Sequence, residues 1–418
     1  MIQRCKSSHL YPICGASIVA LVLLGCGEAT TPSSPTVHPL PVVAAAGSTE
    51  AHLATIADEA VIMSWIEPEG EGVALRWSEL NGKQWSTPVT IAAGDNWFVN
   101  WADFPSVEPI NDTVWAAHWL VKKPGGTYAY DVTMAISRDS GAAWSEPFVP
   151  HQDGTATEHG FVSLFPWQGD VGALWLDGRK TQAEGEAHGH GGGMTLRAAA
   201  IDAELAPRNK TEVDGLVCDC CQTDVAIAAS GPVAVYRNRT EDEIRDIYVA
   251  RSINGDWKDG VAIANDGWEI AGCPVNGPAI TAEGNHIGVA WFTAARGETK
   301  IRFAYSLDSG ATFVDAIDIS LDRPIGRVDT VLLADGSALV SWLRSAQGTA
   351  GDIVVRSVSA DGELGPVHVI AATAAGRMSG FPQMVLRGED VIFAWTDVND
   401  TTTQVHTAIA RAETLRPH

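Results

Sequence analysis

The strongest constraint on the fold is a short apolar strand, ending in tryptophan or tyrosine, that recurs along the chain roughly every 50 residues. Each copy is preceded by another short apolar strand and followed by a third that leads into a glycine-containing turn. Helical periodicity is nearly absent. This pattern predicts an all-β chain folded as a β-propeller of four-stranded blades. The seven copies are Val61–Trp65, Val114–Trp119, Val171–Trp175, Val233–Tyr236, Ile287–Trp291, Ala338–Trp342 and Val391–Trp395.

The number of repeats predicts seven blades, with six as the alternative because boundaries drawn from a sequence are soft. The last repeat stops after its third strand, Gln404–Ala412. We expect Pro39–Ala46 to supply the missing outer strand, so that the propeller spans residues 39–416 and closes without an open sheet edge. The predicted blades span residues 48–95, 100–152, 158–215, 217–267, 271–321, 325–372 and 376–414.

The N-terminus has the layout of a signal peptide over residues 1–25, with two basic residues before the apolar run Ala16–Leu24. That run is shorter than the roughly 20 residues that span a bilayer. The segment Leu-Leu-Gly-Cys ending at Cys26 resembles the lipobox of bacterial lipoproteins. The resemblance implies that Cys26 is lipidated and anchors the chain in the cell envelope, and Gly27 at the next position favours the outer membrane. Residues 26–38 are expected to form a flexible tether.

Acidic residues dominate the charge, because 51 Asp and Glu against 28 Lys and Arg give a formal net charge of −23. Such a surface repels nucleic acid phosphates, so no nucleic-acid partner is expected. We expect a monomer whose partners are the membrane, through its lipid, and a small anionic ligand or glycan.

Two turns share one motif. Ser137–Trp144 and Ser306–Phe313 both follow the pattern Ser-x-Asp-Ser-Gly-Ala-x-aromatic, and degenerate copies occur at 77–85, 252–257 and 359–362. They resemble the Asp-box of sialidases and other BNR-repeat propellers. In this motif we expect Asp to accept backbone N–H bonds, Gly to take a positive φ and the aromatic ring to pack between blades. The resemblance implies a fold rather than an activity, and seven blades depart from the six of sialidase catalytic domains.

Residues just before the innermost strand of each blade are expected to line the mouth of the central channel. Aligning the repeats on their aromatic-ended strands puts Cys220 and Cys273 at the same position in blades four and five. The alignment needs gaps of one or two residues in three of the blades. With those gaps it predicts a mouth that combines one carboxylate, one imidazole, thiols and two guanidiniums. The other residues at this position are Asp103, His159, Arg327 and Arg377.

The cysteines expected in the mature chain, besides the lipidated one, are Cys218, Cys220, Cys221 and Cys273. In an oxidising compartment such a cluster predicts disulfides, for which three connectivities exist. The alternative is a thiolate metal centre, because Cys218 and Cys221 have the two-residue spacing of a zinc or copper chelate. The compressed Cys-Asp-Cys-Cys run fits Cu(I) better than zinc. Two imidazoles in a glycine-rich loop, His188 and His190, would either add to metal capture or be incidental.

Arginines supply a second predicted feature of the pocket, since several guanidiniums together can clamp a carboxylate or sulfate. The candidate anion ligands are Arg179, Arg237, Arg245, Arg327 and Arg377. The alternating charges around Arg237 and Arg245 also fit an ordinary salt-bridged hairpin.

Sialidases use an arginine triad, an acid/base Asp and a Tyr nucleophile activated by Glu. The resemblance therefore implies Asp103 as the acid, Tyr236 with Glu241 or Glu243 as the nucleophile pair, and a triad of Arg245, Arg327 and Arg377. The chain departs from the family, because the first blade lacks an Arg-Ile-Pro segment and Tyr236 falls on the second strand of its blade. The Cys-Asp-Cys-Cys-Gln-Thr segment looks like that of a group of bacterial sialidase-like proteins.

The residues support three hypotheses. The first is a lipid-anchored propeller whose axial pocket binds an anionic or metal-associated ligand, with copper or zinc as the candidate metal. The second is a sialidase-type glycoside hydrolase that acts on acidic glycans. The third is a scaffold for protein interactions whose pocket has no ligand.

Overall fold

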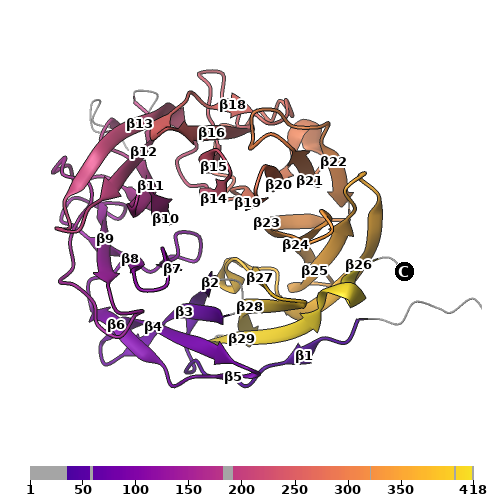
Figure 1. The fold of residues 1–418 in the computed structure, drawn as a ribbon, viewed down its shortest axis with the longest axis horizontal. Helices are drawn as coiled ribbons and strands as arrows, with labels where there is room; N and C mark the ends of the chain where they lie inside the picture. The colour runs from indigo at the N-terminus through magenta and orange to yellow at the C-terminus, as the bar shows by residue number, and fades with distance from the viewer. Residues whose placement is uncertain (1–34, 57–59, 182–191, 321, 400–401, 417–418) are drawn as a thin grey trace, which may run out of the picture. The chain divides into compact units, whose positions relative to one another are not determined.

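The computed structural model describes residues 35–56, 60–181, 192–320, 322–399 and 402–416, all within one compact unit, Ser34–His418. The predicted signal peptide, Cys26, most of the tether and the loop with His188 and His190 lie outside the described residues. Within this unit, seven antiparallel sheets are arranged around a central axis as the blades of a propeller (Figure 1). The predicted fold class and the count of seven blades are therefore confirmed.

The strands of blades one to three run outward from the axis. Blade one is β2 (Thr49–Ile56), β3 (Ala60–Glu69), β4 (Gly72–Asn81), β5 (Gln84–Trp85) and β6 (Val89–Gly94), the last two both paired with β4. Blade two is β7 (Ser106–Pro109), β8 (Trp115–Lys122) and β9 (Tyr130–Ser137). Blade three is β10 (His159–Trp167), β11 (Asp170–Asp177), β12 (Met194–Ile201) and β13 (Pro207–Val217).

Blades four to six follow the same order. Blade four is β14 (Asp224–Ala228), β15 (Gly231–Arg237), β16 (Ile247–Ile253), β17 (Asp256–Trp257) and β18 (Val261–Ala262), the last two both on β16. Blade five is β19 (Ala279–Glu283), β20 (His286–Thr293), β21 (Lys300–Ser306) and β22 (Ile317–Ser320). Blade six is β23 (Pro324–Leu332), β24 (Ala338–Ser345), β25 (Ala350–Val358) and β26 (Leu364–Ala374).

The seventh blade combines strands that are distant in sequence. It consists of β27 (Gln383–Arg387), β28 (Asp390–Asn399), β29 (Thr402–Arg411) and β1 (His38–Pro39). In the outer pair His38 lies opposite Ile409, and the Leu40 N–H donates to the Thr407 carbonyl at 2.9 Å. The first described strand therefore covers the outer edge of the last blade.

Blade two is the least regular, because a single bridge between Met134 and Phe148 holds the place of its outer strand. Prolines at 147 and 150 flank Phe148, and proline has no N–H to donate to a ladder. Among the described residues, helix is limited to short 3-10 turns, which include η2 (Ala295–Gly297), η3 (Arg377–Ser379) and η4 (Ala412–Leu415). No helix in the described part of the chain is long and apolar enough to cross a membrane.

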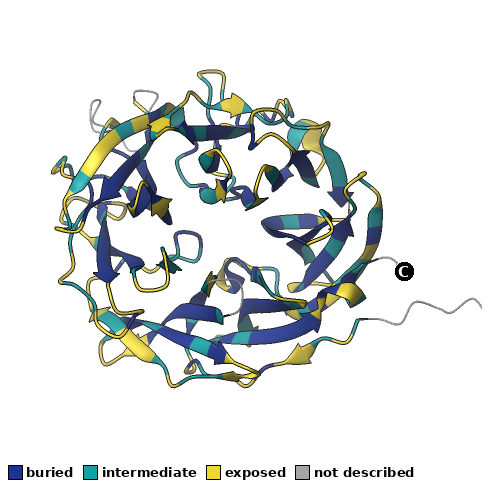
Figure 2. Cartoon of the chain, viewed as in Figure 1, coloured by how far each residue is buried: buried dark blue, intermediate teal, exposed yellow. Residues whose placement is uncertain are grey.

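The hydrophobic core is divided into seven clusters, each lying between one blade and the next around the ring. The aromatic residues that end the repeated strands are buried in these clusters, and Figure 2 shows burial concentrated in the middle of the blades. A four-stranded sheet exposes two faces, so each blade needs a neighbour on both sides. The buried aromatic residues that end the repeated strands are Trp65, Trp119, Trp175, Tyr236, Trp291, Trp342 and Trp395.

The two Asp-boxes form the turns expected of them. Asp139 accepts from the Ala143 N–H and Asp308 from the Thr312 N–H, each at 2.8 Å. Gly141 has φ +80°, and a Cβ there would lie 2.8 Å from the Trp115 ring, so only glycine fits. These contacts tie the outer turns to the inter-blade clusters.

Candidate functional site

The innermost strands of the seven blades surround a central cavity of about 710 Å³, whose lining includes three half-buried acids, Glu108, Asp224 and Asp329. Burial raises the pKa of Glu108 and of Asp329 to about 8, and the pKa of Asp224 to about 6. Asp224 accepts from the Ile280 N–H at 2.8 Å and Asp329 from the Met384 N–H at 2.6 Å. Each of these two acids thus joins its blade to the next one.

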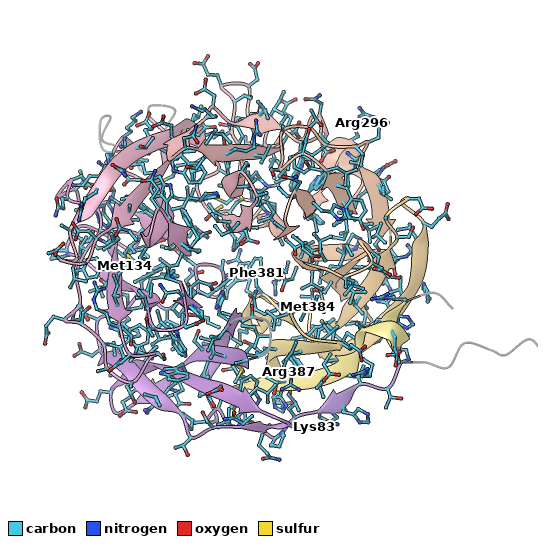
Figure 3. All side chains as sticks on the ribbon, in the orientation of Figure 1. Lys83, Met134, Arg296, Phe381, Met384 and Arg387 are labelled. Atoms are coloured by element: carbon cyan, nitrogen blue, oxygen red, sulfur yellow. A yellow bond between two sulfur atoms is a disulfide. The ribbon has the colours of Figure 1, made fainter. Side chains whose placement is uncertain are left out.

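Loops that precede the innermost strands cross-link the ring at the channel. Gln222 of blade four donates to the Ala102 carbonyl of blade two at 2.5 Å and accepts from the Gly277 N–H of blade five at 3.0 Å. The rings of Trp101 and Phe381 stack with centroids 5.9 Å apart. Figure 3 shows Phe381 near the centre of the ring, whereas Lys83 lies at its outer edge.

The predicted Asp103 lies in a buried carboxyl cluster beside this mouth. The Tyr130 hydroxyl is 2.8 Å from both Asp103 Oδ2 and Glu158 Oε1, and Asp103 Oδ1 accepts from the Phe161 N–H at 2.6 Å. Tyrosine has one proton to donate, so one of the two carboxyls must supply a proton of its own. Burial raises the pKa of Asp103 to about 7 and, with nearby negative charges, the pKa of Glu158 to about 8. Near neutral pH this cluster therefore holds at least one shared proton.

Tyr130 and Glu158 were not among the residues singled out from the sequence. Tyr130 begins β9 and Glu158 directly precedes β10, and a parallel bridge between the two residues joins blades two and three. Glu50 adds a third carboxyl, whose pKa burial and the charge of Asp103 raise well above its usual range. The mouth is consequently richer in acids than the sequence suggested.

The tyrosine predicted as nucleophile has another role. Tyr236 is fully buried in β15, and its hydroxyl donates to Asp214 Oδ2 at 2.7 Å. Glu243 instead pairs with Arg239 and Arg245, while Glu241 is exposed. The predicted pairing of Tyr236 with Glu241 or Glu243 is corrected, because side chains of a middle strand pack between blades rather than face the channel.

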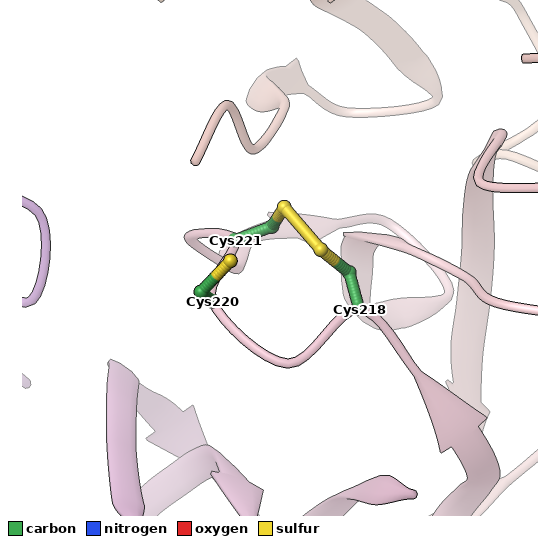
Figure 4. A group of neighbouring side chains, drawn as sticks. All are labelled: Cys218, Cys220 and Cys221. Atoms are coloured by element: carbon green, nitrogen blue, oxygen red, sulfur yellow. A yellow bond between two sulfur atoms is a disulfide. The ribbon is translucent and has the colours of Figure 1, made fainter. Parts of the chain in front are cut away.

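The four cysteines converge where blades four and five meet the mouth. Figure 4 shows the disulfide between Cys218 and Cys221, with Cys220 beside it. Cys220 and Cys273 are free. The three sulfur atoms of Cys218, Cys220 and Cys221 all lie within 4.8 Å of one another. A hydrogen bond between the free thiols, together with burial, raises the pKa of Cys220, and the same bond lowers the pKa of the exposed Cys273. Cys273 is thus the better thiolate of the pair.

The five predicted anion-binding arginines do not converge on one pocket. Arg237 donates to the carbonyls of Asn276, Arg245 and Phe292, at 2.9, 2.6 and 2.7 Å, and so ties blade four to blade five. Arg179 forms two 2.6 Å bonds to Asp177. These two guanidiniums serve backbone and carboxylate partners inside the protein, which corrects their assignment to the axial ligand.

The remaining three arginines lie at the mouth in two groups. Arg245 pairs with Glu243 at 2.8 Å and lies 3.5 Å from Cys218 Sγ. Arg327 donates to the Ser379 hydroxyl at 2.7 Å and lies over the Trp101 ring at 4.7 Å. Arg377, which is exposed, lies 5.9 Å from the centroid of the same Trp101 ring. A guanidinium pair, rather than a triad, therefore stands beside Trp101.

The predicted mouth residue His159 is fully buried between blades two and three, with its ring stacked on His151 at a centroid distance of 3.8 Å. Burial lowers the pKa of His159. The neighbouring Glu158 approaches the mouth cluster instead, so the register predicted for blade three is displaced by one residue.

No protein-family model and no curated protein matches the chain by sequence. Among solved structures, a protein of unknown function from Dyadobacter fermentans aligns over 91% of this chain and 98% of its own, with 12% identity and a TM-score of 0.51. The polysaccharide lyase Uly1 aligns over 87% and 90%, with 9% identity and a TM-score of 0.52. The NanB sialidase of Streptococcus pneumoniae aligns over 92% and 71%, with 12% identity and a TM-score of 0.44. At such identities the likeness to the first two shows the β-propeller fold alone.

Proposed function

We propose that this chain is a cell-envelope lipoprotein whose propeller mouth binds a soft metal ion, or a ligand that carries one, through Cys220 and Cys273. The observation that carries the proposal is that Cys220 and Cys273 are both free and lie close enough at the mouth to shift each other's pKa. Cys273 is exposed and Cys220 is half-buried, so an ion can reach the pair from solvent. Lipidation at Cys26 and an outer-membrane location are part of the proposal.

The thiol pair favours Cu(I) over zinc. A structural zinc site takes four ligands, commonly four thiolates or a mixture with imidazole, whereas Cu(I) is selected by soft sulfur ligands. The disulfide between Cys218 and Cys221 removes two of the four sulfurs from coordination. Two thiolates beside the carboxylate of Asp219 remain for a soft cation.

The surroundings of the thiols favour a cation over an anion. Glu158 is close enough to Asp219 and Cys273 for their charges to raise its pKa, after the larger effect of burial. Arg239 and Arg245 are held by Glu243 and Asp219. Because these guanidiniums already have carboxylate partners, the anionic ligand of the first hypothesis finds few free donors near the cysteines.

Titration with Cu(I) against a competing chelator tests the proposal. Protein purified without reductant is expected to show two reactive thiols per chain in denaturant, from Cys220 and Cys273, and to bind one Cu(I). Cys220→Ser or Cys273→Ser should weaken binding at least about tenfold. The double variant Cys218→Ser/Cys221→Ser keeps both ligands and serves as the control. Native protein without free thiols would contain a second disulfide and would exclude the proposal.

A second function is supported by the position of Tyr130 between Asp103 and Glu158. Glycoside hydrolysis of the sialidase type uses a tyrosine nucleophile, and carboxyl groups serve glycosidases as acid, base or nucleophile. Turnover of a fluorogenic sialoside that is abolished by both Tyr130→Phe and Asp103→Asn would establish this activity. Tyr236→Phe, whose hydroxyl bonds Asp214 elsewhere in the fold, is the matched control. Absence of turnover on acidic glycosides would leave the metal-binding function.

A further inference from the structure

We propose that a buried cluster of two histidines and three aspartates between blades two and three binds a divalent transition-metal ion, with Zn²⁺ as the ion that suits it best. The cluster consists of Asp131, His151, Asp153, His159 and Asp177. It is separate from the cysteines and independent of the function proposed for them.

Three strand ends and one loop bring these side chains together. Asp131 is the second residue of β9, His159 is the first of β10 and Asp177 is the last of β11. His151 and Asp153 come from the segment between β9 and β10. The His151 side chain is 2% exposed, and those of His159 and Asp177 are fully buried.

The two imidazoles stand parallel between two carboxylates. Asp153 Oδ2 lies 3.1 Å from His159 Nε2 and 3.3 Å from His151 Nδ1. On the other side Asp131 Oδ1 lies 3.6 Å from His151 Nε2 and 3.7 Å from His159 Nδ1. Asp177 Oδ1 approaches His159 Nε2 at 3.8 Å. The donors thus form two overlapping sets that share His159, one with Asp131 and His151 and the other with Asp153 and Asp177, and within each set the donor atoms lie within 4.8 Å of one another.

One donor atom in the cluster lacks a hydrogen bond. His151 Nε2 is buried and has no hydrogen-bond partner, although it faces Asp131. A buried ring nitrogen without a partner is costly, and buried polar groups in native proteins are almost always satisfied by protein, water or an ion. A metal ion at this position would give His151 a partner without any change of residue.

Charge also favours a cation. The protein cations closest to the three carboxylates are Lys123, 3.1 Å from Asp131, and Arg179, which contacts Asp177 at 2.6 Å and Asp153 at 3.1 Å. Arg197 lies 3.8 Å from Asp177 but makes its shorter contact with Glu212. Buried charges are stable only when they are paired or bind a metal. Imidazole and carboxylate together form the borderline donor set that suits Zn²⁺, whereas thiols select softer ions.

A metal ion in this cluster would also stabilise the residues of the mouth. Asp131 follows Tyr130 and His159 follows Glu158, and neighbouring side chains in extended backbone point to opposite sides. Tyr130 and Glu158 therefore approach the mouth cluster while Asp131 and His159 turn into the metal cluster. An ion held by Asp131 and His159 would fix the two strand ends that position the Tyr130–Glu158 pair.

The experiment uses the mature chain with Cys220→Ser and Cys273→Ser, so that the thiols cannot bind the added ion. Chelator-treated protein is titrated with Zn²⁺ by calorimetry, and its melting temperature is measured with and without Zn²⁺. We expect one Zn²⁺ per chain and a rise in melting temperature, because a ligand that binds only the folded state stabilises it. His151→Gln should lower the affinity at least about tenfold and remove the rise.

His118→Gln is the matched control, because His118 is also a fully buried imidazole without a partner at Nε2, and it lies outside this cluster. It should keep Zn²⁺ binding. If His151→Gln does not fold, Asp131→Asn provides the same comparison. Absence of Zn²⁺ binding by the parent, or equal binding by parent and His151→Gln or Asp131→Asn, would overturn the proposal. Loss of Cu(I) binding at the thiols would leave it untouched.

Discussion

Asp103 shows how a single buried acid sets the pH response of the fold. Its pKa is raised from 3.8 to about 7 in the folded protein, chiefly by burial. The folded state therefore binds this proton more tightly than the unfolded chain, and stability falls as pH rises from about 4 through 7. We predict that Asp103→Asn reduces the loss of unfolding free energy between pH 5 and pH 8 by on the order of 2 kcal/mol. Urea unfolding at both pH values measures the difference.

Asp112→Asn, at an exposed position, is the control and should keep the wild-type pH profile. The prediction is wrong if Asp103→Asn loses as much stability as the parent over this range. Asparagine keeps an oxygen for the Phe161 N–H, so the comparison isolates the carboxyl charge.

Residue-level prediction from sequence failed where it depended on register. Cys220 and Cys273 were aligned without gaps, and their thiols do meet. Blade three needed a gap, and the one-residue error selected His159 in place of Glu158. In extended backbone such an error moves a side chain to the opposite face. The alignment compared only the residues that precede the innermost strand of each blade. Tyr130 lies on the third strand of its blade and reaches the mouth from there, so the alignment could not find it.

At the scale of elements, β1 and the chain that follows it are expected to hold the seventh blade closed. Leu40 and Ala44 are buried against the first and seventh blades, and the Gly47 N–H donates to the Thr403 carbonyl at 2.7 Å. We predict that Leu40→Ala lowers the free energy of unfolding by about 2–5 kcal/mol, as for other buried leucines. Val42→Ala, two residues away at 45% exposure, should change it by less than about 0.5 kcal/mol. Equal effects of the two substitutions in denaturant unfolding would show that this segment does not close the ring.

Elements were easier to predict than residues because their signals are repeated. Each middle strand alternates side chains toward both neighbouring blades and ends in a buried aromatic, so seven independent copies indicate one register. The outer strands carry less apolar surface, and the irregular outer edge of blade two, with Phe148 between two prolines, has no such pattern.

At the scale of the whole molecule, seven small cores replace one large core. Each cluster requires two blades, so removing any blade exposes two apolar faces and the ring is stable only when closed. The fold could be inferred from repetition alone for this reason. The site could not, because it depends on which side chains from at least six blades meet at the mouth.

The whole molecule is also strongly acidic, with a net charge of −23, so the propeller has no electrostatic attraction to anionic lipid headgroups. The membrane association proposed for this chain would then depend on acyl chains at Cys26, each buried CH₂ contributing about 0.8 kcal/mol. We predict that Cys26→Ser abolishes fatty-acid labelling and moves the protein from the membrane fraction to the soluble fraction. Cys14→Ser, which changes a cysteine inside the predicted signal peptide, should leave both unchanged. Cys26→Ser protein that still resists extraction from membranes by high salt would contradict lipid anchoring and point to a protein partner in the envelope.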